Sequence, residues 1–288
     1  MRFSVHTDTT APSVQESDIK SVKTLAPAVY VAQLTADDDD AKLYVYKTTD
    51  RPLYEPADTP ILEREFYNLR LLRGASNIVR LVAAVVSPNP YRTWTPDAAE
   101  QDDEPRVLRG LLLEYHAAGS LKDILSAPRS EPQPTMPSSS SRPSADTGRA
   151  SSPHRCRRWA HQVALGVRSL HRAGLTHLDL KPQNVVISDA GDAVLIDLSG
   201  MAVTQEYLAP EVQDVFEPRE LDFRLRVLND CWALGKVVRF LADHVMRFHH
   251  GDDDEAELDV LTRTAERLLR DDPQTRICID EAISLLAA

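Results

Sequence analysis

The chain has 288 residues, which is enough for one large domain or two smaller ones with a sizeable hydrophobic core. Hydrophobic residues make up 42% and charged residues 27%, as in an ordinary globular protein, and the net charge of −11 argues against binding to nucleic acids or anionic membranes. No apolar run approaches the ~20 residues of a membrane helix, and residues 1–10 lack the apolar core of a signal peptide. Three scattered cysteines form no CxxC pair and indicate no disulfide framework, which favours a reducing intracellular compartment, the cytoplasm.

The first part of the chain is predicted to form a small antiparallel sheet. Residues 1–19 are polar with little periodicity, and we expect them to form a flexible N-terminus. Runs rich in β-branched and aromatic residues then predict strands at 22–25, 29–34, 43–47, 77–85 and 111–116. A Pro-rich, charged loop is expected between the last two strands, from residue 88 to residue 105.

One helix is expected to interrupt these strands, from Ile61 to about Arg73, after a Thr-Pro pair typical of a helix start. Its apolar stripe includes a carboxylate, Glu65. A buried carboxylate is costly unless it is paired, and Lys47 at the end of a predicted strand is the obvious cation. Glu63 is a rival partner, but it projects nearer the flank of the helix, so we expect an ion pair between Lys47 and Glu65.

The second half of the chain is predicted to be mainly helical, beginning with a short helix at 120–125. The Ser- and Pro-rich residues 126–153 cannot bury enough apolar surface to become ordered, so we interpret them as a disordered insert. An amphipathic helix follows, with its apolar face between residues 159 and 170. Residues 249–257 are interpreted as a solvated, charged loop.

Residues 176–187, which read THLDLKPQNVVI, concentrate chemistry between a predicted helix and a predicted strand. A carboxylate (Asp179), an ammonium (Lys181) and an amide (Asn184) fall within six residues. Catalytic groups are often carried by such a loop, because rigid elements on both sides hold it in place. Further along, Asp197 ends another predicted strand, and residues 204–211 read TQEYLAPE.

These motifs, in this order, resemble those of the eukaryotic-type protein kinase family. The string HLDLKPQN resembles the catalytic loop, and TQEYLAPE resembles the segment that positions the substrate. The resemblance covers about residues 20–288 apart from the insert. It implies a bilobal α+β fold, with a small lobe at 20–113 made of an antiparallel sheet and one helix, and a larger, mainly α-helical lobe at 114–288.

The resemblance implies roles for five polar residues in phosphoryl transfer. Asp179 would accept the proton of the attacking hydroxyl, and Lys181 would contact the transferred phosphate. Thr204 would contact both of these side chains. Asn184 and Asp197 would hold magnesium.

The resemblance also implies a binding site for ATP. Lys47, oriented by Glu65, would hold the α- and β-phosphates. The remaining contacts would come from residues around the end of the last predicted strand: Leu113 beside the pocket, the backbone of Glu114 and His116 at the adenine edge, and Ser120 near the ribose.

Three residues are implied to support the catalytic segments. Glu211 would need a buried cation, which Arg276 would supply. Asp230 would bind the backbone of the catalytic loop.

The chain departs from the family pattern in three places. Residues 24–29 read TLAPAV where a glycine-rich phosphate loop is expected, which should weaken ATP binding. Leu178 replaces the arginine that precedes the catalytic aspartate, and only three residues separate Gly200 from Thr204, so the activation segment is very short. The last two departures predict that the chain is not activated by phosphorylation of this segment.

The leading hypothesis is therefore a serine/threonine protein kinase that uses ATP and magnesium to phosphorylate a protein substrate. The alternative is a catalytically weak or inactive pseudokinase that acts as a binding module, which the missing glycines and the short activation segment favour. A small-molecule kinase of the aminoglycoside type fits less well, because that family lacks both the Ala-Pro-Glu segment and the lysine after the base.

Overall fold

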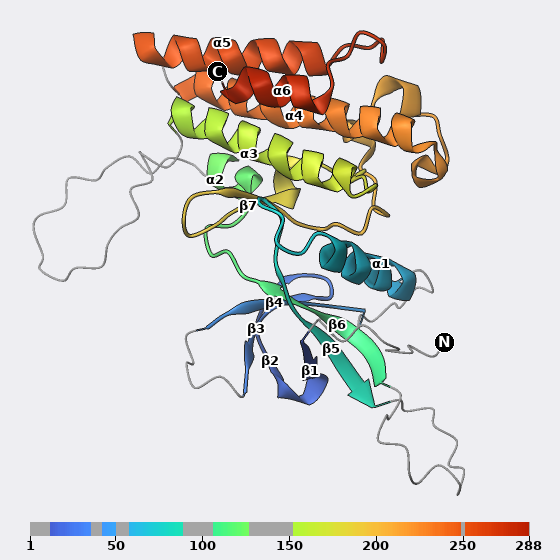
Figure 1. Ribbon diagram of the computed structural model, residues 1–288. Coiled ribbons are helices and arrows are strands. Elements are labelled where there is room, and N and C mark those ends of the chain that lie inside the picture. Colours follow the sequence, from blue (N-terminus) through green and yellow to red (C-terminus); the bar gives the residue numbers. More distant parts are fainter. Residues whose placement is uncertain are drawn as a thin grey trace, which may run out of the picture. The chain divides into compact units, whose positions relative to one another are not determined.

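The computed structural model describes residues 12–35, 42–49, 58–88, 106–126, 152–248 and 251–287 (Figure 1). The chain divides into two compact units. Unit 1 comprises Met1–Gly74, Val79–Tyr115 and Asp197–Ser199, and unit 2 comprises Ala75–Ile78, His116–Ile196 and Gly200–Ala288. Unit 1 contains the large sheet and unit 2 is mainly helical, which confirms the predicted bilobal α+β fold class.

The sheet of unit 1 has six strands in the described part of the chain, in the order β1-β5-β6-β4-β3-β2. In chain order they are β1 (Ser13–Gln15), β2 (Ile19–Ala26), β3 (Val29–Leu34), β4 (Tyr44–Thr48), β5 (Leu81–Pro88) and β6 (Arg106–Glu114). Neighbouring strands run antiparallel, except that β1 pairs with β5 in parallel. Alternating residues of β3 to β6 bury a core around Tyr44, Tyr46, Val85 and Leu112.

Unit 1 also contains α1 (Asp58–Leu71), which packs against β5 and β6. Leu62, Glu65, Phe66 and Leu69 are all buried, as their three- and four-residue spacing predicted. Because Glu65 lies in this apolar row, its carboxylate enters the protein interior and needs a cation there.

Residues 13–18 differ from the flexible N-terminus that we expected up to residue 19. They form β1 and the 3-10 helix η1 (Glu16–Asp18). Val14 lies opposite Val85 of β5 and packs against the sheet core, and Tyr46 donates a hydrogen bond to Glu16 (3.2 Å). A three-residue strand is too short to show an alternating pattern, so its order comes from pairing with distant residues. Residues 1–11 lie outside the described part of the chain.

Unit 2 is built from α2 (Leu121–Ser126), α3 (Pro153–Arg172), α4 (Phe223–Phe248), α5 (Asp252–Leu268) and α6 (Ile279–Ala287). The helix α3 packs against α4, α5 and α6, and α4 packs against α5 (Figure 1). A two-stranded antiparallel sheet, β7 (Val185–Ile187) with β8 (Ala193–Leu195), follows the loop that contains Asp179. The described residues of this unit also form four short 3-10 helices: η3 (Pro182–Asn184), η4 (Gln205–Tyr207), η5 (Pro210–Val212) and η6 (Pro218–Glu220).

Two expectations about loops have different outcomes. The prediction of a loop at 249–257 is wrong from Asp252 onward, because α5 begins there. Acidic residues favour the first turn of a helix, and Asp254 accepts a hydrogen bond from the N–H of Gly251 (3.1 Å). Most of the expected insert, residues 127–151, and most of the expected Pro-rich loop, residues 89–105, lie outside the described residues.

The part of the chain that the structure describes contains no helix with the length and apolar character needed to cross a membrane.

Candidate active site

Lys47 is the centre of a polar cluster in unit 1. Its Nζ lies 2.5 Å from Oε2 of Glu65 and 2.8 Å from Oδ1 of Asp197. The expected ion pair between Lys47 and Glu65 is therefore present, and β4 and α1 supply its two partners. Asp197 adds a second carboxylate to the same ammonium.

Burial and charge act in opposite directions in this cluster. Burial lowers the pKa of the Lys47 ammonium, but Glu65 and Asp197 outweigh that effect and raise its pKa overall. Burial raises the pKa of Glu65, and the nearby Lys47 offsets only part of this rise. Lys47 consequently remains a cation at neutral pH and can attract an anionic group.

The backbone around Asp197 is held in an uncommon conformation. Its φ of 61° lies in the left-handed region, which costs a residue other than glycine about 1–2 kcal/mol. Asn68 of α1 donates a hydrogen bond to the carbonyl of the next residue, Leu198 (2.7 Å), and Lys47 holds the Asp197 carboxylate. Strain of this kind is often found at functional sites, where surrounding contacts maintain it.

A hollow of about 110 Å³ lies beside Lys47 in unit 1. Its other lining residues are Pro27, Ala28, Val29, Thr48, Thr49, Ile61 and Leu62. Pro27 and Ala28 form a two-residue turn between β2 and β3, and the Ala28 carbonyl accepts a hydrogen bond from Thr48 (2.9 Å). Proline has no N–H to donate, so this turn offers fewer backbone donors to a phosphate than a glycine-rich loop would.

The residues of unit 2 that are predicted to be catalytic form a closed hydrogen-bond network around Asp179. Thr204 donates its hydroxyl to Oδ1 of Asp179 (2.5 Å), and Lys181 donates to Oδ2 (2.7 Å). Lys181 also donates to the Thr204 hydroxyl (2.8 Å). Asn184 donates its amide to the Asp179 carbonyl (2.8 Å) and to its Oδ2 (3.0 Å). Four residues that the sequence singled out are thus brought together on one loop and one neighbouring segment.

Asp230 of α4 holds the backbone just before Asp179. It is fully buried and accepts hydrogen bonds from the N–H groups of His177 and Leu178, both at 2.9 Å. His171 at the end of α3 contacts the same carboxylate through Nε2 (3.0 Å). Leu178 has a φ of 62°, so these bonds stabilise a strained backbone next to the proposed base. The Leu178 side chain is buried in the apolar interior.

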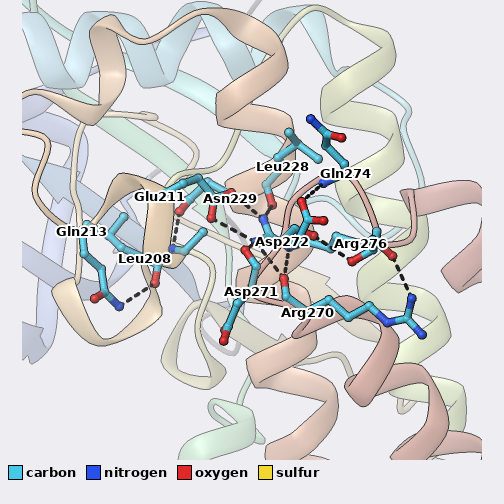
Figure 2. Close-up of polar contacts among 12 residues, drawn as sticks. Leu208, Glu211, Gln213, Leu228, Asn229, Arg270, Asp271, Asp272, Gln274 and Arg276 are labelled. Atoms are coloured by element: carbon cyan, nitrogen blue, oxygen red, sulfur yellow. Dashed lines mark hydrogen bonds and ion pairs between the residues drawn. The ribbon is translucent and has the colours of Figure 1, made fainter.

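Arg276 anchors the segment that follows Thr204 (Figure 2). Its fully buried guanidinium binds Glu211 in a bidentate manner, with Nη1–Oε1 at 2.6 Å and Nη2–Oε2 at 3.0 Å. It also donates to the carbonyls of Leu228 and Arg270 and stacks over Trp232, with its Cζ 5.1 Å from the ring centroid. The ion pair expected between Glu211 and Arg276 is present.

The four residues proposed to contact the adenosine part of ATP are divided between the two units. Leu113 and Glu114 end β6 in unit 1, where Leu113 is buried and the Glu114 N–H donates to the carbonyl of Arg80 (3.1 Å). His116 and Ser120 belong to unit 2. Their part in binding a nucleotide stays a prediction.

Three structural roles were missed by the sequence analysis. Ser120 forms a capping box at the start of α2, because its Oγ accepts the N–H of Asp123 (3.2 Å) while Asp123 Oδ2 accepts the N–H of Ser120 (3.1 Å). The Ser-x-x-Asp spacing was the available signal. Asn68, three residues after Glu65, and His171, beside Asp230, bind partners that are far away in sequence, and only the position of Asn68 on the inward stripe of α1 hinted at its role.

The oxygen atoms of Asn184 and Asp197 suit magnesium, which prefers oxygen ligands. Asn184 donates hydrogen bonds to Asp179 through Nδ2, so the amide oxygen of Asn184, Oδ1, points away from the Asp179 carboxylate. Asp197 contacts Lys47 through Oδ1. Either side chain would hold a metal ion only together with further ligands, which phosphate oxygens and water supply in such sites.

Comparison with known proteins identifies the family of this chain. The family model described as "Protein kinase domain" matches residues 30–287. The chain is 23% identical over 225 residues to Wee1-like protein kinase 2 of Xenopus tropicalis, and this alignment covers 70% of this chain and 34% of that protein. It is 26% identical over 165 residues to serine/threonine-protein kinase 17A of Oryctolagus cuniculus, and this alignment covers 52% of this chain and 35% of that protein. It is 28% identical over 123 residues to smooth-muscle myosin light chain kinase of Gallus gallus, and this alignment covers 38% of this chain and 6% of that protein. The matches thus span about a third or less of each relative's own length. Since the family model covers most of the sequence, the chain belongs to the protein kinase domain family.

Proposed function

We propose that this chain transfers the γ-phosphoryl group of ATP to a serine or threonine hydroxyl of a protein, with magnesium as the cofactor. The observation that carries this proposal is the network of Asp179, Lys181, Thr204 and Asn184, whose hydrogen bonds are 2.5–3.0 Å long. A loop with only a structural role would not require this set of a carboxylate, an ammonium, a hydroxyl and an amide. The relatives named above, two of them described as protein kinases acting on serine/threonine or on myosin light chain, support protein phosphorylation in general.

In this mechanism the substrate hydroxyl lies next to Asp179, which orients it and accepts its proton. A bond forms between the hydroxyl oxygen and the γ-phosphorus while the bond to the bridging oxygen breaks, and ADP leaves. Lys181 stabilises negative charge on the transferred group, and Lys47, oriented by Glu65, holds the α- and β-phosphates. Magnesium, when bound by Asn184 and Asp197, would neutralise phosphate charge.

The proposal is tested by measuring phosphate transfer from Mg-ATP to a generic basic protein. Asp179→Asn should lower the rate at least ~100-fold, because a positioned general base contributes about that much. Asp189→Asn is the matched control, since Asp189 is exposed in the turn between β7 and β8, and it should retain the wild-type rate. Equal rates for the wild type and Asp179→Asn would remove the proposed catalytic role.

Lys47 requires a variant that leaves no buried charge unpaired. Lys47→Met alone would strand the fully buried carboxylate of Glu65, which could unfold the chain. The double variant Lys47→Met with Glu65→Gln avoids this problem. It should keep its thermal transition yet lose transfer activity, and full activity in this variant would exclude Lys47 from the mechanism.

The tight turn at Pro27 and Ala28 favours a second candidate, a kinase fold that serves as a binding module without catalysis. A fluorescent ATP analogue, titrated with and without magnesium, distinguishes the two candidates when it is combined with the transfer assay. Nucleotide binding with transfer supports the enzyme. Absence of both supports the binding module.

A further inference from the structure

Thr176 begins the stretch of unit 2 that leads into the proposed base, Asp179, and its side chain meets an arginine of α4. Arg226 donates a hydrogen bond from Nη1 to the hydroxyl of Thr176, which is a buried residue (3.2 Å). The two residues lie 50 positions apart in the sequence, so the contact depends on the tertiary fold. Neither residue belongs to the groups proposed to contact ATP, magnesium or the substrate.

Two further contacts hold the Arg226 side chain in place. Its Nε donates to the carbonyl of Leu221 (3.1 Å), and its Cζ lies 5.7 Å from the ring centroid of Phe223. A guanidinium is planar and presents its N–H groups in a fixed fork, so bonds to two acceptors define its orientation. Arg226 therefore connects the residues just before α4 with Thr176.

Asp230 lies one turn after Arg226 on α4 and binds the next two residues of the same stretch. Its carboxylate accepts the N–H groups of His177 and Leu178, both at 2.9 Å. Residues four positions apart are neighbours on one face of a helix, so Arg226 and Asp230 act from the same side. Together they bind three consecutive residues, 176–178, to one long helix.

The backbone of this stretch depends on such support. Leu178 has a φ of 62°, in the left-handed region that residues other than glycine rarely adopt, and such a conformation persists where surrounding contacts hold it. The Thr176 carbonyl lies close to Gly200, because a Cβ atom on that glycine would come within 3.1 Å of the oxygen. Thr176 is thus confined by Gly200 at its backbone and by Arg226 at its side chain.

We propose that Arg226 is a positioning residue for phosphoryl transfer, and that it acts through the Thr176 hydroxyl to fix the place of the Asp179 carboxylate. This inference rests on the proposed function. Asp179 follows Thr176 by only three residues, so a shift at Thr176 moves the proposed base. A misplacement of about 1 Å in a catalytic group can cost ~100-fold in rate. The effect should fall on kcat, because ATP and the substrate are bound by other residues.

Two substitutions of Thr176 test the role of its hydroxyl in the transfer assay with Mg-ATP. Thr176→Val keeps the shape of the side chain but removes the acceptor, and water can take the freed N–H because Arg226 is only partly buried. This variant should lower kcat at least ~10-fold, while KM for ATP and for the protein substrate changes less than about twofold. Thr176→Ser should keep kcat within about threefold of the wild type, because its hydroxyl still accepts the hydrogen bond.

Substitution of the arginine tests the same contact from its other side. Arg226→Met should lower kcat at least as far as Thr176→Val, and the double variant should lie within about threefold of Arg226→Met, because both changes remove one interaction. Arg224→Met is the matched control, since Arg224 is an exposed residue of the same helix, and it should keep the wild-type kcat. A wild-type kcat in Thr176→Val, or an equal fall in Thr176→Ser, would overturn the inference.

Amide hydrogen exchange separates this inference from the proposed function, because it requires no catalysis. The N–H groups of His177 and Leu178 are bonded to Asp230, so they should exchange slowly in the wild type. Thr176→Val should speed their exchange at least ~10-fold, measured by mass spectrometry on peptides that span residues 174–180. If the wild type transfers no phosphate, the proposed function fails, yet the hold on this stretch stands if exchange rises in this way. Equal exchange in the wild type and Thr176→Val would refute it whatever the transfer assay gives.

Discussion

Arg276→Met tests whether a buried ion pair holds the segment after Thr204 in place. The Arg276 guanidinium is fully buried and makes hydrogen bonds to Glu211 and to the carbonyls of Leu228, Arg270 and Asp271 (Figure 2). Methionine keeps much of the side-chain volume but supplies none of these donors. The change therefore removes hydrogen bonds while it largely preserves packing.

The expected loss in the free energy of unfolding is about 3 kcal/mol. Breaking a buried ion pair by removing one partner costs about 3–5 kcal/mol. The lower end of this range applies because the Glu211 side chain is 19% exposed and retains some contact with water. For a chain of this size such a loss lowers Tm by roughly 6–12 °C. The fold should survive, since native domains are stable by about 5–15 kcal/mol.

Urea unfolding followed by circular dichroism measures this loss, with Arg263→Met as the matched control. Arg263 pairs with Asp259 one turn away on α5, but both side chains are more than half exposed, so its loss should cost less than about 0.5 kcal/mol. The double variant Arg276→Met with Glu211→Gln should lose at least ~1 kcal/mol less than the sum of the two single variants, because no carboxylate is then left unpaired. Losses that differ by less than about 1 kcal/mol between Arg276→Met and Arg263→Met, or strictly additive losses, would refute the reasoning.

Three further predictions concern separate parts of the molecule. Asp230→Asn places an amide NH₂ against one of two backbone N–H groups, so the free energy of unfolding measured in urea should fall by about 2–3 kcal/mol and phosphate transfer should slow. The control Asp243→Asn, on the exposed side of the same helix, should change neither quantity. A loss of stability below about 0.5 kcal/mol for Asp230→Asn would contradict this prediction. Ala28→Gly removes a left-handed alanine (φ 59°) from the turn between β2 and β3 and should raise stability by about 0.5–1 kcal/mol in thermal unfolding; a decrease would mean that the lost methyl contacts outweigh the relieved strain. Burial raises the pKa of the Cys156 and Cys231 thiols to about 12, while Cys278 is exposed. A disulfide reagent at pH 8 should therefore modify one thiol in the native chain and three in denaturant. A second fast-reacting thiol in the native chain would disprove this assignment.

The sequence by itself determined those features that depend on local spacing. Six residues of one loop contain Asp179, Lys181 and Asn184, so their proximity needed no tertiary information. Glu65 was identified because helical periodicity places it on an apolar stripe, where a buried carboxylate requires a cation. The confirmed fold class follows from the same signals, because strand-like and helix-like patterns occupy different parts of the chain.

Only the tertiary structure decided which distant segments meet. The pairing of β1 with β5 and the contact of Asn68 with Leu198 join residues that lie 71 and 130 positions apart in the sequence. No periodicity in the sequence encodes such contacts, because they depend on how elements pack together after each has formed. The local pattern could therefore name the chemical groups of the proposed site, while the folded chain was needed to show which distant residues hold them in place.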